Sequence, residues 1–296
     1  MRNNVYPIAW ARAIAGRIPN REEILSYLSL SSETELMEKV TRRLGIKQQY
    51  DNVEHELKNY IGTVAVNMSM LADAATPQLR SLQLFNIKLT LERMISGQIE
   101  FKKEGLYLSN GIPILDAQLK RIFEAGSVER IKAGEQWIDD LFIRLRRTCG
   151  EQPDAGCISL FLDREGAIYA SKFMGLGSMS RFEIDAYNAK ISLMVESERR
   201  EIAGSLYIGE RPKPLSMQEM ISYLQKKYNL RSEFNDLDQF IESSRHELAM
   251  RNMNKFDESN TYSVLQLLLA FERKIKIINQ TIKQKINKEY AAKILS

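Results

Sequence analysis

The chain has few of the residues that interrupt helices. Only 7 prolines and 15 glycines occur among its 296 residues. Because short strands joined by tight turns need more of both residues, this scarcity favours long helices. The apolar fraction of 44% and the charged fraction of 27% are ordinary for a globular protein. A chain of this length can bury one large core or divide into two or three smaller ones.

Long apolar runs are also missing. No segment approaches the ~20 consecutive apolar residues that a membrane-spanning helix needs. The most apolar window, residues 264–271, is short and contains Gln266. The N-terminal segment carries Arg2, but Pro7 and Arg12 break its apolar stretch, so it does not resemble a secretory signal. We therefore expect a soluble, cytoplasmic chain that reaches a membrane only through a partner.

Residues that bind metals or act as nucleophiles are scarce. The two histidines, His55 and His246, lie far apart, and Cys149 and Cys157 lack the spacing of zinc ligands. We expect ordinary thiols in a reducing compartment, with a disulfide across this short loop as the open alternative. The sequence contains no phosphate loop, dinucleotide fingerprint or nucleophile elbow. It therefore predicts no metal, no cofactor and no enzymatic activity.

Helix-start patterns recur along the chain. In each, a Ser, Thr or Asn side chain accepts a hydrogen bond from the first turn, and in most of them a glutamate three residues on can reach back. Apolar residues follow these starts at helical spacing, and period-two alternation is nearly absent. Residues 157–162 resemble a strand, but they lead into a helix-like segment, so we expect a helix. The start patterns are Asn20 with Glu23, Ser32 with Glu35, Ser180 with Glu183, Ser216 with Glu219, and Thr76 before Pro77.

Clusters of turn-forming residues divide the chain. They occur at residues 104–113, 150–156 and 204–214, and the first and third separate parts of roughly a hundred residues each. We expect an all-α fold made of three multi-helix modules. These modules are predicted at residues 1–105, 106–210 and 211–296.

Each of the three parts ends in a similar helical sequence. An aromatic residue, a polar residue and a lysine two positions further on occur within the same apolar frame. Positions 86 and 188 are 102 residues apart, and positions 188 and 272 are 84 residues apart. These periods are too long for tetratricopeptide or ankyrin units and favour three modules over a solenoid. The three sets are Phe85, Asn86 and Lys88; Tyr187, Asn188 and Lys190; and Phe271, Glu272 and Lys274.

One segment near the C-terminus is strongly basic. Between residues 273 and 293 the only acidic residue is Glu289, and Tyr290 is the only aromatic residue. Such a face attracts an acidic protein, anionic lipid headgroups or phosphates, but it can also be a merely solvated helix face. The missing aromatic residues disfavour nucleic acid. The basic residues are Arg273, Lys274, Lys276, Lys283, Lys285, Lys288 and Lys293.

Several of these segments resemble a known family, the C-type subunits of the V/A-type rotary ATPases and ATP synthases, which are related to the d-type subunits of eukaryotic V-ATPases. The opening Tyr-Pro-Ile-Ala-Trp-Ala-Arg-Ala at residues 6–13 is similar to the family's first helix. Residues 183–190, Glu-Ile-Asp-Ala-Tyr-Asn-Ala-Lys, resemble its acidic-x-Asp-x-x-Asn-x-basic helix. The closing helix departs from the family in having Lys274 near the slot of the usual asparagine. Further similar segments are residues 20–28, 85–88 and 262–278.

The resemblance implies a mechanical function. Family members are funnels of three helical modules around a pseudo-threefold axis. They are non-catalytic rotor adaptors between the D and F proteins of the central axle and the rotor ring on the cytosolic face of a membrane. The chain would then touch the membrane only through the ring and bind no nucleic acid.

The repeat helices supply the predicted partner-binding residues. They would line or brace the socket for the axle, or only tie helices together within each module. A scaffold of another membrane-associated machine, such as a secretion system, is the alternative function, and an anion or nucleic-acid binder that uses residues 273–293 is a third. The six residues are Asn86, Lys88, Asn188, Lys190, Glu272 and Lys274.

Overall fold

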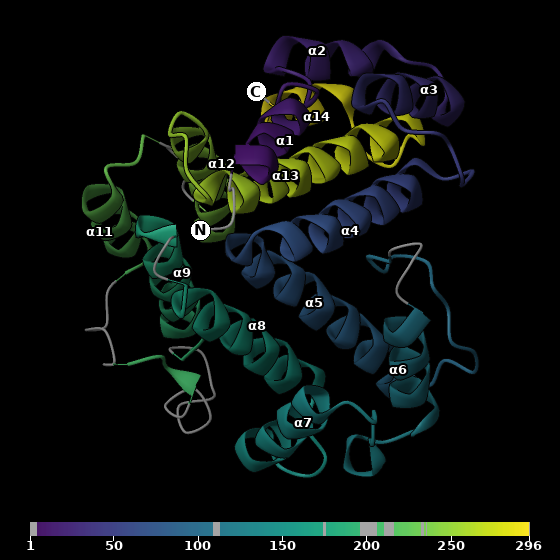
Figure 1. Cartoon of the computed structure of the whole chain (residues 1–296), viewed down its shortest axis with the longest axis vertical. Coiled ribbons are helices and arrows are strands. Elements are labelled where there is room, and N and C mark those ends of the chain that lie inside the picture. The colour runs from purple at the N-terminus through teal and green to yellow at the C-terminus, as the bar shows by residue number, and fades with distance from the viewer. Residues whose placement is uncertain are drawn as a thin grey trace. The chain divides into compact units, whose positions relative to one another are not determined.

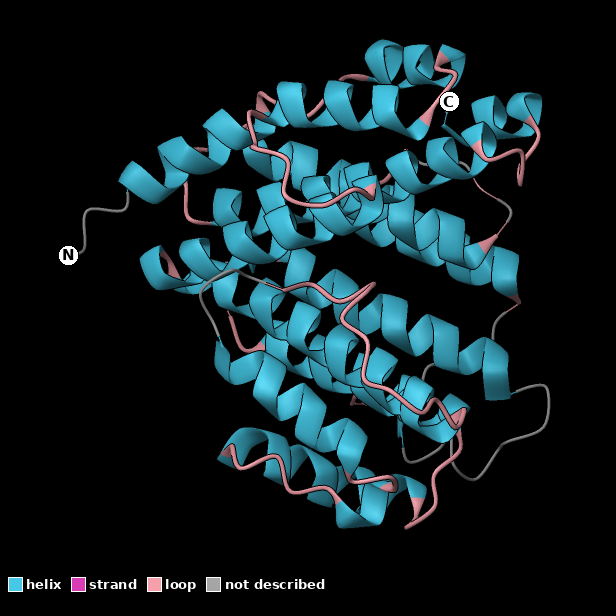
Figure 2. Cartoon of the chain, turned by 90° about the vertical axis from the view of Figure 1, so that its right-hand side faces the viewer, coloured by secondary structure: helices cyan, strands magenta, loops and turns pink. Residues whose placement is uncertain are grey.

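The computed structural model describes residues 5–108, 113–173, 176–195, 206–209, 216–231, 234 and 236–295. These residues form helices joined by loops, and none of them lies in a strand (Figure 2). The all-α fold predicted from the sequence is confirmed. In the same residues, no helix combines the length and the apolar character that crossing a membrane requires.

The chain forms two compact units. The first comprises Met1–Thr76, Glu104–Ser109 and Leu248–Ser296, and the second comprises Pro77–Lys103 and Asn110–Glu247. The division into three modules at residues 1–105, 106–210 and 211–296 stays a prediction.

The first unit is built around one long helix, α13 (Ser259–Ile282). Every residue from Ser259 to Leu269 is buried, so the helix is covered on all sides at this end. A helix that is buried all round needs neighbours on every side, and α13 contacts α1, α3, α4, α14 and the short 3₁₀ helices η1 and η2 (Figure 1). The other elements of this unit are α1 (Val5–Ala15), α2 (Arg21–Ser26), η1 (Tyr27–Ser29), α3 (Glu33–Leu44), α4 (Val53–Leu71), η2 (Asp73–Ala75) and α14 (Lys288–Leu295).

The second unit contains amphipathic helices that bury one face. In α7 (Gln136–Cys149), the residues at positions 138, 141, 142 and 145 are buried, which is the i, i+3, i+4, i+7 stripe of an amphipathic helix. This helix packs on α8, and α9 packs on both α8 and α11. The other elements are α5 (Thr76–Ile95), α6 (Pro113–Glu124), η3 (Val128–Arg130), α8 (Ala155–Ser171), α9 (Ser178–Val195), α11 (Met217–Tyr228) and α12 (Leu237–Met253), which ends in the first unit.

Three of the predicted helix starts are confirmed. The side chains of Asn20 and Ser32 accept the predicted hydrogen bond from the backbone amide three residues on. Ser216 forms the full capping box with Glu219, whose carboxylate accepts a hydrogen bond from the Ser216 amide at 2.8 Å. These caps involve residues close in sequence, so the local pattern suffices to predict them.

Two predicted starts are wrong, one by three residues and the other by one. Helix α9 begins at Ser178, so Ser180 lies inside its first turn and donates a hydrogen bond to the Gly177 carbonyl at 3.0 Å. Helix α5 includes Thr76 itself because the 3₁₀ turn η2 already brings the backbone of Thr76 into helical geometry. In both cases the preceding turn moves the helix start towards the N-terminus.

The predicted helix at residues 157–162 is confirmed within α8. The break before it spans Gly150 to Asp154, and Asp154 caps α8 by accepting a hydrogen bond from the Cys157 amide at 2.9 Å. The predicted break at 104–113 contains no helix at residues 104–108. The predicted break at 204–214 lies outside the described residues except for residues 206–209.

Cys149 and Cys157 form a disulfide, which corrects the expectation of two free thiols. Cys149 ends α7 and Cys157 lies in the first turn of α8. The turn between these helices brings the two Cα atoms to 5.9 Å, which is within the normal range for a disulfide. The spacing in the sequence does not reveal this turn, and for that reason the expectation failed.

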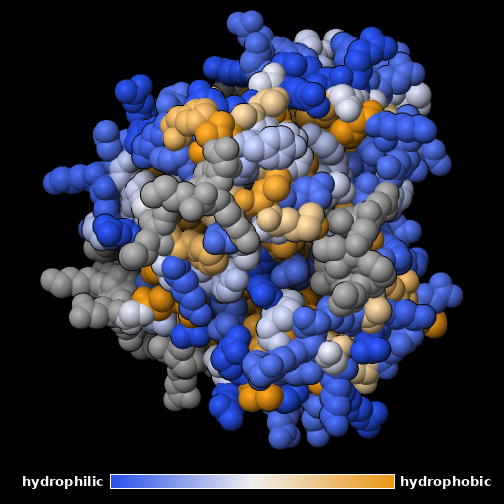
Figure 3. Space-filling model, viewed as in Figure 1, coloured by the Kyte–Doolittle hydropathy of each residue, from blue (hydrophilic) through white to orange (hydrophobic). Residues whose placement is uncertain are grey.

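The surface shows no single broad apolar face in the view of Figure 3. Hydrophilic side chains dominate, and hydrophobic residues appear in several separate groups. Scattered apolar residues of this kind are normal on globular proteins.

Candidate interaction residues

The six predicted partner-binding residues lie on α5, α9 and α13, and the three helices bury them in the same way. Two positions along a helix correspond to a rotation of roughly 200°, so the polar residue and the lysine of each repeat point to opposite sides. The polar residues Asn86, Asn188 and Glu272 are 0%, 9% and 6% exposed. The lysines at positions 88, 190 and 274 are partly exposed.

Glu272 forms a buried cluster with Tyr107 and Lys58. The Tyr107 hydroxyl donates a hydrogen bond to Glu272 Oε2 at 2.5 Å, and Lys58 Nζ lies 3.4 Å from Glu272 Oε1. The Lys58 ammonium also lies 4.3 Å from the centre of the Tyr107 ring, as in a cation–π contact. Only 13% of the Lys58 side chain and 8% of the Glu272 side chain are exposed. Both oxygens of this buried carboxylate therefore have partners.

Burial dominates the electrostatics of this cluster. It lowers the pKa of Lys58, and the adjacent Glu272 carboxylate opposes that shift. Burial and the Glu272 charge together raise the pKa of Tyr107 far above its usual value. The phenol is therefore a permanent hydrogen-bond donor at physiological pH, and Glu272 is its acceptor.

A glycine in α4 lets the loop that carries Tyr107 reach this cluster. A Cβ atom on Gly62 would lie 2.6 Å from the carbonyl oxygen of Leu108. That distance is too short for any side chain, so the 104–108 segment packs directly on the α4 backbone. Lys58 lies one helical turn before Gly62, which places its ammonium beside Tyr107.

Asn188 holds a short loop segment against α9. Its side-chain amide donates to the Ile208 carbonyl at 3.0 Å and accepts from the Ile208 amide at 3.1 Å. The neighbouring Tyr187 hydroxyl donates to the Leu206 carbonyl at 3.1 Å. Two consecutive residues of the repeat therefore pair with residues 206–208 of the same unit.

The surroundings of Asn86 and Lys274 also come from the unit to which each residue belongs. Asn86 is fully buried in α5, and its carbonyl accepts a hydrogen bond from Thr90 Oγ1 at 2.8 Å. Burial and the nearby Arg21 charge both lower the pKa of Lys274. The charge of Arg21, at the start of α2, therefore acts on this lysine of α13.

Lys88 and Lys190 face carboxylates of neighbouring helices. Lys88 Nζ lies 3.8 Å from Asp163 of α8, and Lys190 Nζ lies 2.5 Å from Asp238 of α12. The charge of Lys190 also acts on Asp163. The lysines of the first and second repeats thus lie close to one carboxylate in the second unit.

Asp163 combines exposure with an unusual pKa. Desolvation raises its pKa, although Lys88, Lys190 and Arg245 act in the opposite direction. Yet 52% of its side chain is exposed. Because solvent screens a half-exposed carboxylate, we expect this shift to affect the free energy of unfolding only slightly.

The sequence did not reveal the residues that complete these contacts. Lys58, Tyr107, Asp163 and Asp238 come from helices or loops far from the repeat motifs. The Tyr107–Glu272 pair is separated by 165 positions, and no local pattern connects them. Among these residues, Lys58 differs from a surface lysine only in its partly buried position on α4.

No metal site was found among these side chains. In the part of the chain that the structure describes, no group of three or more His, Cys, Asp or Glu residues could hold a metal ion. The clusters at Glu272 and Asn188 pair their polar atoms with other segments of the same unit. The arrangement therefore positions helices and loops. Whether the six residues also bind a partner stays a prediction.

Comparison with protein-family models and with curated proteins finds no match to this chain.

Proposed function

We propose that the chain is a non-catalytic helical adaptor of a V/A-type rotary ATPase, linking the central axle to the membrane rotor ring. The observation that carries the proposal is the burial pattern that the polar and lysine positions share in the three repeat helices. Each presents a buried polar residue and, two positions on, a partly exposed lysine. This agreement supports three related modules, which in this proposal surround a pseudo-threefold axis as a funnel.

The buried polar contacts suit a part that transmits force. Fully satisfied polar groups in a low-dielectric interior fix a single arrangement of the segments that they join. Glu272 fixes the 104–108 loop on α13 and α4, and Asn188 fixes residues 206–208 on α9. An adaptor that passes torque between two partners needs this resistance to deformation.

The partners follow from the family resemblance. The D and F proteins of the axle would occupy the socket, and the rotor ring would hold the chain at the cytosolic face of the membrane. The chain itself would touch the membrane only through the ring. The lysines of the repeats, which keep part of their surface exposed, are the side of each motif that a partner can reach.

Co-purification from the source organism tests this proposal. A tagged chain expressed in its own host should recover the catalytic and axle proteins of the ATPase from mildly solubilised membranes, identified by mass spectrometry. A tagged, unrelated helical protein of similar charge is the control. Absence of every rotary ATPase component would overturn the proposal, and recovery of secretion components instead would favour the alternative scaffold.

A further inference from the structure

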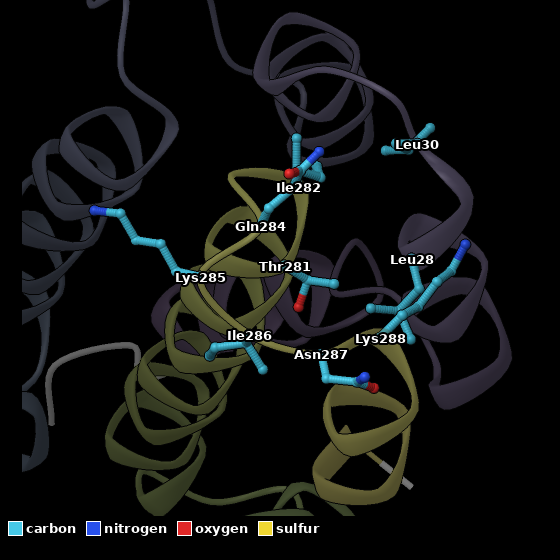
Figure 4. A pocket seen from close by; sticks show the side chains of 9 residues that line it. All are labelled: Leu28, Leu30, Thr281, Ile282, Gln284, Lys285, Ile286, Asn287 and Lys288. Atoms are coloured by element: carbon cyan, nitrogen blue, oxygen red, sulfur yellow. The ribbon is translucent and has the colours of Figure 1, made fainter.

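A pocket lies where α13 turns into α14 in the first unit. It has a volume of about 550 Å³, within the usual range for ligand pockets. Its walls come from the end of η1 and the following residue on one side and from the α13–α14 turn on the other (Figure 4). The lining residues are Leu28, Leu30, Thr281, Ile282, Gln284, Lys285, Ile286, Asn287 and Lys288.

The pocket combines apolar walls with two exposed lysines. Leu30, Ile282 and Ile286 are only partly buried, so apolar surface faces the pocket. Lys285 and Lys288 are exposed, and neither has a carboxylate within ion-pair distance among the described residues.

Glu33 does not neutralise these lysines, because it already pairs with a different one. Its carboxylate lies 2.7 Å from Lys283 Nζ. Lys285 and Lys288 therefore give the turn an excess of positive charge beside the pocket, where Glu289 is the only acidic residue between positions 273 and 293.

We propose that this surface, the pocket with its two exposed lysines, binds an acidic amphipathic segment of a partner protein. An apolar side chain of the segment enters the pocket, and its carboxylates pair with Lys285 and Lys288. The inference does not depend on the function proposed above, because it rests on the charge and shape of this surface alone.

The geometry favours a peptide over a single anion or a membrane. Figure 4 shows Lys288 beside Leu28, whereas Lys285 extends in the opposite direction, away from the other lining residues. Because the two side chains point in different directions, an extended segment that passes from one to the other matches them better than a single phosphate does. A flat layer of lipid headgroups cannot fill a concave apolar pocket, whereas a leucine or phenylalanine side chain can.

Fluorescence anisotropy with the full-length chain tests the proposal. The probe is a short fluorescein-labelled peptide in which glutamates flank a Leu-Leu pair. Two matched peptides carry lysines in place of the glutamates or alanines in place of the leucines. We expect saturable binding of the first peptide and much weaker binding of both matched peptides.

Variants assign the binding to this surface. K285Q/K288Q should weaken binding about fivefold, since each exposed ion pair contributes roughly 0.2–1 kcal/mol. The control K132Q/K226Q removes two exposed lysines of the second unit and should change the affinity less than about twofold. All four lysines are exposed, so both variants should fold as the wild type does.

Three results would overturn the proposal. The first is no binding of the acidic peptide to the wild type. The second is equal affinity of K285Q/K288Q and the control variant. The third is lysine-dependent binding to phosphatidylserine vesicles or inorganic phosphate without binding to the peptide, which would identify a lipid or phosphate site instead.

Discussion

Two lysine–carboxylate pairs, one in each unit, show how burial changes the role of the same charges. In the first unit, Lys58 pairs with a Glu272 side chain that is 8% exposed. In the second, Lys88 pairs with an Asp163 side chain that is 52% exposed. A buried charge depends on its partner because no water can replace it, whereas an exposed charge exchanges its partner for water at little cost. The first pair should therefore govern stability and the second should not.

The largest expected effect comes from removing the buried carboxylate. Glu272→Ala removes the carboxylate that pairs with the buried Lys58 and accepts the hydrogen bond of the Tyr107 hydroxyl. We expect the free energy of unfolding to fall by about 3 kcal/mol, measured by urea denaturation. The double variant Lys58→Met/Glu272→Leu removes both charges and should cost clearly less. If the single and double variants were equally destabilised, the pair would not act as a coupled unit.

An intermediate effect is expected at Asn188, whose uncharged amide holds a loop segment against α9 in the second unit. Asn188→Ala removes both hydrogen bonds to the Ile208 backbone and leaves those backbone groups without their partner. The free energy of unfolding should fall by about 2 kcal/mol, and proteolysis near residues 206–208 should become faster. Lys190→Ala, two residues further on α9, is the control and should lower it by less than about 1 kcal/mol.

The smallest effect is expected at Asp163. Desolvation raises its pKa in the folded state, so the folded chain binds the proton more tightly than the unfolded chain. This carboxyl group therefore lowers stability as the pH rises above its unfolded pKa of roughly 3.9. Asp163→Asn removes that penalty but also removes the exposed pair with Lys88.

Measurements of unfolding across a pH range check this prediction. Relative to the wild type, Asp163→Asn should become more stable as the pH rises from about 3 to 7, with a net change at neutral pH within about 0.5 kcal/mol. A loss as large as that of Glu272→Ala would show that Asp163 is effectively buried, and the contrast between the two pairs would fail.

The parts of this fold that local chemistry determines could be predicted from the sequence. The cap at Ser216 and the helix at residues 157–162 depend on neighbours within a few positions, and both were predicted. The contacts of Glu272 could not be predicted, because its partners lie far away in the sequence, on α4 and in the 104–108 loop. The disulfide was only an open alternative for the same reason, since it depends on how the α7–α8 turn folds back.

The repeat itself was informative beyond the helices that it marked. The residues at its polar position on α5, α9 and α13 were predicted to bind a partner, which stays a prediction, and all three are buried. Its pattern did not predict their partners, because one position is filled by an acid and two by amides. The acid needs a cation and a donor, whereas an amide can pair with a peptide backbone.

The close approach at Gly62 should couple the evolution of two stretches of the chain that are distant in sequence. The α4 backbone and the Leu108 carbonyl leave no room for a side chain at this position. A homologue that acquires a larger residue there must also change the path of its 104–108 segment, and with it the tyrosine that reaches Glu272. Positions 62, 107 and 272 should therefore co-vary when related chains are aligned, although they lie on three separate elements.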